Sequence, residues 1–111
     1  RGRGAGVLLN SAPFSPPTSN PASEAAFAAD VAQSLLGEDH VERELEPSMG
    51  AEDFSFMLQV KPGAYLRLGQ GGEGSCMLHN TRYDFNDDVL PLGAALHAGL
   101  IEQGLALQPP A

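Results

Sequence analysis

The sequence predicts an α/β fold, with helices packed on a sheet. Short strand-like runs alternate with segments of helical periodicity, and no segment repeats another. A chain of 111 residues is the size of one ordinary domain and buries roughly two thirds of the surface that its unfolded form exposes. The pattern therefore predicts a layer of helices over strands around a single core.

The first predicted element is a short strand over residues 7–9. It is followed by SAPFSPPTSNP, whose four prolines interrupt regular structure and indicate a linker. A helix is predicted over 21–36, because Asn20 offers an N-cap oxygen, Pro21 suits a first helical turn and Gly37 provides a C-terminal stop. Its apolar residues recur at helical spacing: Phe27, Ala28, Val31 and Leu35.

The middle of the chain predicts a strand, a helix and a second strand. Residues 40–45 alternate loosely, as expected for a strand with one solvated face. The next segment places Glu52 and Asp53 in a first helical turn, where acids complement the helix dipole, and Pro62 and Gly63 end that helix. The helix carries an apolar stripe of Phe54, Met57 and Leu58. Residues 64–68 predict the second strand, and residues 77–78 a short resumption of it.

A third helix is predicted within residues 85–105. Asn86, Asp87 and Asp88 are the candidate caps, and Pro91 is compatible with a helix because it lies in the first turn. The apolar residues of this helix lie on one side: Val89, Leu92, Leu96, Leu100 and Ile101. The tail from residue 105 to 111 is expected to be frayed.

Charge and cysteine content exclude several classes of partner. The net charge of −8 repels phosphate backbones and anionic lipids, so neither nucleic acid nor a membrane is expected to bind. The single cysteine cannot form an internal disulfide, which favours a cytoplasmic location. No apolar run reaches the length of a membrane helix, and the first ten residues lack the apolar core of a signal peptide.

The glycine-rich stretch LGQGGEGSCMLHN raises two alternatives. Gly69, Gly71 and Gly74 have the G-x-G-x-x-G spacing of a dinucleotide-binding turn, but such a turn requires a helix that begins within the loop. The residues after the loop are weak helix formers and do not continue as a helix, so nucleotide binding is the weakest hypothesis and a flexible surface loop is favoured over it. The alternative is a metal site at His79. From spacing alone a packed histidine is favoured over a ligand, because neither Cys76 nor an acid stands in a chelating spacing with it.

Four sequence blocks in a fixed order favour the metal site at His79. MGAEDF, PGAY, LHN and YDFND occur in succession, and the stretch from about residue 16 to 103 resembles the C-terminal part of the M20 family of metal-dependent amidohydrolases. Within that family it is most similar to the branch of hippurate hydrolases, N-acyl-amino-acid amidohydrolases and auxin-conjugate hydrolases. The resemblance implies a three-layer catalytic domain with a mixed sheet. Residues 1–19 would be the end of a lid-domain strand and its linker, and residues 20–111 the C-terminal part of the catalytic domain.

The resemblance also implies a site. The histidine of the LHN motif is a ligand of a two-metal centre in that family, so His79 is the predicted metal ligand, with zinc, manganese or a similar divalent ion. The other ligands and the general-base glutamate lie in upstream motifs that this sequence does not contain. The resemblance thus implies a hydrolase of N-acyl amino acids, and an inactive C-terminal fragment if these 111 residues stand alone. The rival hypothesis is a non-catalytic module that self-associates into a homo-oligomer.

The remaining polar candidates have simpler explanations. Glu52 and Asp53 are expected to cap a helix, and no catalytic or cofactor-binding residue is assigned. Cys76 is expected to be a buried or idle thiol, since no Lys, Arg or helix N-terminus lies near it in sequence. His97 is predicted at the edge of the core and His40 in a solvated turn. Two further side chains flank His79, where they would either orient it or contact substrate: Asn80 and Arg82.

Overall fold

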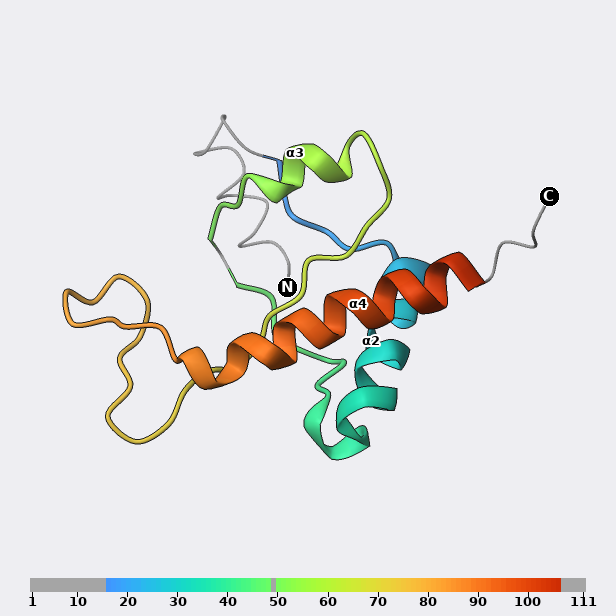
Figure 1. The fold of residues 1–111 in the computed structure, drawn as a ribbon. Coiled ribbons are helices and arrows are strands. Elements are labelled where there is room, and N and C mark those ends of the chain that lie inside the picture. The colour runs from blue at the N-terminus through green and yellow to red at the C-terminus, as the bar shows by residue number, and fades with distance from the viewer. Residues whose placement is uncertain (1–15, 49, 107–111) are drawn as a thin grey trace. The chain divides into compact units, whose positions relative to one another are not determined.

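A computed structural model describes residues 16–48 and 50–106 of the chain. Within these residues it contains three α-helices and two short 3-10 helices (Figure 1). The chain divides into two compact units, Arg1–Tyr65 and Leu66–Ala111. We call them the N-terminal unit and the C-terminal unit. No helix in the described part of the chain is both long enough and apolar enough to cross a membrane.

The longest helix of the N-terminal unit is α2, Ala22–Leu36. It follows the predicted span closely, and Gly37 ends it with φ of 90°, donating its N–H to the carbonyl of Gln33. Two residues of the predicted apolar stripe form the buried side of the helix, Ala28 at 3% and Val31 at 0% exposure. Leu35 from the same stripe remains 45% exposed.

The predicted N-cap of α2 is wrong. Pro21 occupies the capping position without a side-chain hydrogen bond. The side chain of Asn20 instead contacts Tyr65, 45 residues away: its Nδ2 donates to the Tyr65 carbonyl at 3.0 Å, and the Tyr65 N–H donates to its Oδ1 at 2.8 Å. One amide therefore satisfies both backbone polar groups of Tyr65, and it holds the last residue of the N-terminal unit against the start of α2.

The chain leaves α2 through the 3-10 helix η1, Glu38–His40. Val41 is extended, with φ of −122° and ψ of 115°. Arg43 returns to α2, where its guanidinium donates to a carboxylate oxygen of Asp30 at 2.7 Å and to Oε1 of Gln33 at 2.8 Å. Side-chain contacts, and not a sheet, thus attach this segment to the helix.

The short helix α3, Phe54–Leu58, completes the N-terminal unit (Figure 1). Its ring at Phe54 lies 5.4 Å from that of Tyr65 at a tilt of 48°. Gly63 lies close to Leu58 and Phe54, since a Cβ on Gly63 would be 3.6 Å and 3.7 Å from their side chains. Met57, the third member of the predicted stripe, is 63% exposed. Two of the three predicted apolar residues therefore pack.

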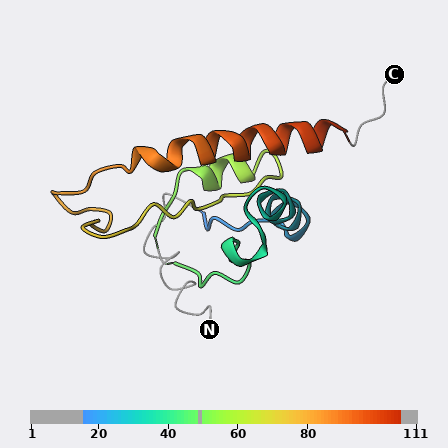
Figure 2. The same ribbon diagram turned by 60° about the horizontal axis from the view of Figure 1, so that its bottom comes forward.

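The C-terminal unit ends in the helix α4, Leu90–Ala106, preceded by the 3-10 helix η2, Asp87–Val89. Figure 2 shows α4 as one continuous helix. Among the three predicted caps the structure selects Asn86, whose Oδ1 accepts the N–H of Asp88 at 3.0 Å. Leu68 lies over the first turn of α4, because a Cβ on Gly93 would be 3.4 Å from its Cδ2.

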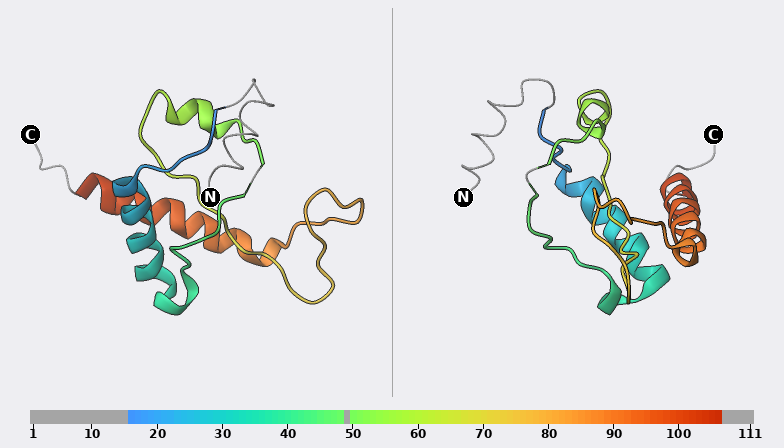
Figure 3. Two further views of the ribbon diagram at one scale, coloured as in Figure 1. Left: turned by 180° about the vertical axis from the view of Figure 1, so that it is seen from behind. Right: turned by 90° about the vertical axis from the view of Figure 1, so that its left-hand side faces the viewer.

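The predicted α/β class is wrong for the described residues, which form helices and turns and no strand (Figure 3). The structure therefore does not contain helices packed on a mixed sheet. An extended segment gains ladder hydrogen bonds only when a second segment pairs with it, and no such pairing forms among residues 16–48 and 50–106. At Tyr65 both backbone groups are already occupied by Asn20. The predicted strand over residues 7–9 lies outside the described residues.

Candidate functional site

The candidate site is a long loop from Gly69 to Asn86, which ends directly before η2 (Figures 1 and 3). We call it the His79 loop. Its two ends are joined by Gln70 and Asn86: the Asn86 N–H donates to Gln70 Oε1 at 3.2 Å, and Asn86 Nδ2 donates to the Gln70 carbonyl at 3.3 Å. Residues 16 positions apart in the sequence therefore close the loop at its neck.

The glycine-rich limb of the loop forms a tight turn. The N–H of Ser75 donates to the carbonyl of Gly72 at 3.0 Å, and the N–H of Gly72 donates to the Ser75 hydroxyl at 3.1 Å. Gly74 lies within this turn with φ of 80°, a conformation that glycine adopts without steric cost. The next helices begin only at Asp87 and Leu90, so no helix N-terminus meets the glycines as a dinucleotide site requires.

The opposite limb is organised by Asn80. Its side-chain oxygen accepts the N–H of Arg82 at 2.8 Å, and its carbonyl accepts the N–H of Tyr83 at 2.9 Å. The Tyr83 ring then meets Phe85 edge to face, with centroids 5.4 Å apart. Asn80 therefore organises the turn that immediately follows His79.

His79 lies at this turn, exposed to solvent. Its φ is 66°, and in the described part of the chain it is the only residue other than glycine with a positive φ. A side chain in this left-handed region costs on the order of 1 kcal/mol or more, although histidine tolerates it better than most residues. Strained residues of this kind concentrate at functional sites, so the geometry distinguishes His79 from the other two histidines.

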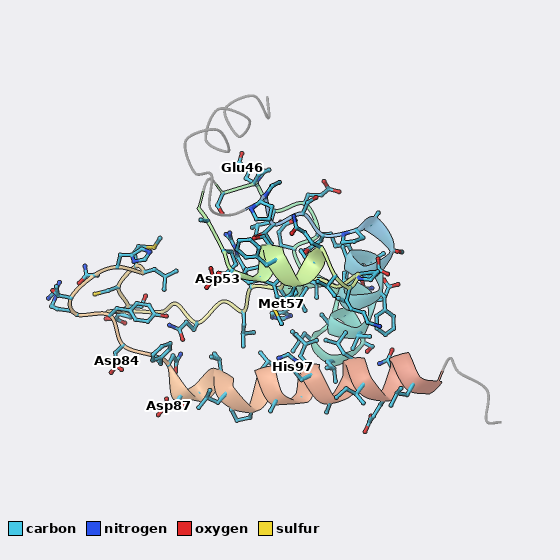
Figure 4. All side chains as sticks on the ribbon, turned by 90° about the horizontal axis from the view of Figure 1, so that it is seen from above. Glu46, Asp53, Met57, Asp84, Asp87 and His97 are labelled. Atoms are coloured by element: carbon cyan, nitrogen blue, oxygen red, sulfur yellow. The ribbon has the colours of Figure 1, made fainter. Side chains whose placement is uncertain are left out.

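The other predicted candidates lie apart from any chemical cluster. Cys76 is a half-buried free thiol in the His79 loop. His40 ends η1 and is exposed, as expected for a turn position. His97 is also exposed on α4, so its predicted place at the edge of the core is wrong. Asp84 and Asp87 both precede α4, and Asp87 is the first residue of η2 (Figure 4).

Glu52 and Asp53 precede α3 and do not lie in its first turn, so that part of the prediction is wrong, but Glu52 still contacts the start of the helix. Its Oε1 accepts the N–H of Phe54 at 3.4 Å, at the start of α3. Its Oε2 also accepts the hydroxyl of Tyr65 at 2.9 Å, a contact that the sequence does not predict. Asp53 precedes α3 directly (Figure 4) and makes no side-chain capping hydrogen bond to it. The MGAEDF and PGAY blocks are thus joined through one carboxylate and one phenol.

The described residues do not form a metal site by themselves. A stable divalent site needs three or four donors, and residues 16–48 and 50–106 contain no group of three or more His, Cys, Asp or Glu side chains placed to hold an ion. His79 contributes a single imidazole. The predicted metal therefore does not fit this set of residues without further ligands.

Sequence reasoning missed the residues that shape the loop. Gln70 and Tyr83 form its neck together with Asn86, which was considered only as a helix cap. No local pattern marks such a contact, because the partners are 13 and 16 residues apart. An indirect indication was available: the blocks PGAY and YDFND border the glycine-rich loop at its two ends.

Comparison with known proteins agrees with the four sequence blocks. The family model "Peptidase family M20/M25/M40" matches residues 8–103. The chain is 37% identical over 92 residues to the IAA-amino acid hydrolase ILR1-like 4 of Arabidopsis thaliana. The aligned region covers 79% of this chain and 20% of that protein. It is 36% identical over 94 residues to a hippurate hydrolase of Campylobacter jejuni, covering 85% of this chain and 24% of the relative.

A third relative comes from an archaeon. Thermostable carboxypeptidase 1 of Saccharolobus solfataricus is 47% identical over 58 residues, half of this chain and 15% of that protein. No solved structure matches the chain significantly. The chain thus spans between 15% and 24% of the length of these three relatives. Because the family model covers most of the sequence, this chain belongs to the M20/M25/M40 family of peptidases and related hydrolases.

Proposed function

We propose that this chain is part of a metal-dependent amidohydrolase that cleaves the amide bond of N-acyl amino acids such as hippurate. The family match over residues 8–103 carries the proposal. The names of two relatives, an IAA-amino acid hydrolase and a hippurate hydrolase, support an amino-acid conjugate as the substrate class. The carboxypeptidase relative also acts by name on a bond next to an amino-acid residue.

His79 is the residue of this chain that we assign to the metal, as one ligand. Its place in the LHN block, its exposure and its left-handed backbone support that role. Zinc and manganese are the candidate ions, since both accept imidazole and carboxylate ligands. The described residues provide no set of three donors, so the remaining ligands and the general base would come from outside them. We assign no catalytic residue within this chain.

The first experiment replaces His79 in the full polypeptide that the gene encodes. His79→Asn removes the imidazole but retains a residue that tolerates positive φ. Release of glycine from hippurate should fall at least about a thousandfold, since a lost ligand forfeits several kcal/mol of transition-state stabilisation. His97→Asn, an exposed substitution on α4, is the control and should retain activity. Full activity of His79→Asn would disprove the metal assignment.

The 111-residue chain alone provides a second test. We expect neither stoichiometric zinc or manganese by elemental analysis nor release of amino acids from N-benzoyl and N-acetyl substrates, because the described residues offer one ligand of the required set. Stoichiometric metal and turnover at the mass of 11.6 kDa would contradict the need for further ligands. No hydrolysis of any N-acyl amino acid by the polypeptide that the gene encodes would overturn the proposed activity itself.

A further inference from the structure

The neck of the His79 loop assigns a second residue to the site. We infer that Gln70 is a positioning residue for His79: its side chain closes the loop, and the closed loop fixes the backbone from which the imidazole projects. The inference rests on the proposed role of His79 as a metal ligand. It adds a residue, nine positions before His79, whose role is to keep one ligand in place without contacting substrate or metal itself.

Gln70 uses each of its polar groups at the neck except its own N–H. Its Oε1 accepts the Asn86 N–H at 3.2 Å, its carbonyl accepts Asn86 Nδ2 at 3.3 Å, and its Nε2 donates to the hydroxyl of Tyr83. All three residues are half-buried, whereas His79 and its immediate neighbours are exposed. The neck is therefore the more protected part of the loop, and its hydrogen bonds compete less with water.

The neck is connected to His79 through a short series of contacts. Tyr83, held by Gln70, donates its N–H to the Asn80 carbonyl at 2.9 Å. Asn80 follows His79 directly and also holds Arg82 through its side-chain oxygen. On the other side, Asn86 accepts the N–H of Asp88 and so fixes the neck to η2 and the beginning of α4. Gln70 thereby links the turn at His79 to a helix end.

Closure of this kind supports the loop because few apolar side chains beside His79 are buried. A flexible segment loses conformational entropy when its ends are brought together, and the apolar side chains beside His79 are exposed, Met77 at 84% and Leu78 at 66%. The left-handed φ of His79 also needs support from its surroundings. Without the contacts of Gln70, the loop should populate many conformations and the imidazole should lose its defined position.

The test measures loop order directly by NMR relaxation of the full polypeptide that the gene encodes. In the native chain the backbone order parameters of residues 77–82 should be near 0.85, and in Gln70→Met, which keeps length but removes both polar atoms, they should fall below about 0.6. Gln59→Met is the matched control, an exposed glutamine next to α3 in the N-terminal unit. It should leave the loop unchanged.

A conservative variant separates positioning from general loss of structure. In Gln70→Glu one carboxylate oxygen still accepts the Asn86 N–H, and the Tyr83 hydroxyl can donate to the other, so order should be largely restored. Native order parameters in Gln70→Met, or no recovery in Gln70→Glu, would overturn the inference. These results do not depend on catalysis. Absence of hippurate hydrolysis by the encoded polypeptide would refute the proposed function, whereas unchanged loop order would refute the role of Gln70.

Discussion

Each of the two units is closed by side-chain amides, but in different ways. In the N-terminal unit Asn20 alone satisfies both backbone groups of Tyr65, across 45 residues. In the C-terminal unit the side chains of Gln70 and Asn86 each bond to a backbone group of the other residue, across 16 residues, and the Tyr83 hydroxyl bonds to Gln70 as well. An amide carries both a donor and an acceptor, so it can replace the pair of hydrogen bonds that a neighbouring strand would otherwise provide.

The apolar support under these contacts also differs. The N-terminal unit contains the fully buried Val31 and the nearly buried Ala28, whereas every apolar side chain between residues 66 and 105 is half-buried or exposed. The amide contact of the N-terminal unit therefore supplements a small apolar core. In the C-terminal unit the neck is the main constraint on a long exposed loop, so local order there depends more heavily on a few polar groups.

The largest expected effect follows from removing the apolar support of the N-terminal unit. Val31→Asp places a carboxylate at a position with 0% exposure, and it should lower the free energy of unfolding of this unit by more than about 3 kcal/mol. Urea unfolding followed by circular dichroism measures the loss. Ala26→Asp, at an exposed position of the same helix, should cost far less. Equal losses in both variants would show that Val31 is not a core residue.

The second effect tests the contact between Asn20 and Tyr65. Asn20→Ala removes two hydrogen bonds, which together should cost about 1 to 2 kcal/mol. Hydrogen exchange at the Tyr65 amide should accelerate by a corresponding factor, while exchange in the His79 loop stays unchanged. Ser19→Ala, one position earlier and exposed, is the control. Unchanged exchange at Tyr65 in Asn20→Ala would refute the contact.

A gain in stability of about 1 kcal/mol is expected in the C-terminal unit. Gly93→Ala replaces a glycine within α4 by the best helix former, and the new Cβ would lie 3.4 Å from Leu68 Cδ2, an ordinary contact distance. Thermal unfolding should shift upward. The reciprocal variant Ala94→Gly, at the adjacent exposed position, should shift it downward by a similar amount. Destabilisation by Gly93→Ala would mean that Leu68 cannot accommodate a methyl group.

The smallest effect concerns the ion pair of the N-terminal unit. Arg43 and Asp30 are 40% and 70% exposed, and exposed pairs contribute less than about 1 kcal/mol. Arg43→Gln should therefore reduce the free energy of unfolding only slightly, and 1 M salt should remove the difference from the native chain. A loss above 1 kcal/mol that persists in high salt would show that the hydrogen bond to Gln33 dominates instead.

The sequence by itself determined the helices and the family. Helices α2 and α4 follow their predicted spans because helical hydrogen bonds join residues four positions apart, and apolar spacing, prolines and glycines mark their limits. The ordered blocks from MGAEDF to YDFND indicated the family that the comparison confirms. The assignment of His79 also came from the sequence, and it stays a prediction.

Only the tertiary structure decided what the extended segments do. The expected sheet required partners that no local pattern identifies, and Tyr65 bonds to a side chain instead of a strand. The same limit applies to Asn20, expected as a cap, and to Gln70, for which the sequence indicated no role. Their partners lie 45 and 16 residues away. Contacts between distant residues depend on how the whole chain folds, because loop closure brings them together and sequence spacing does not.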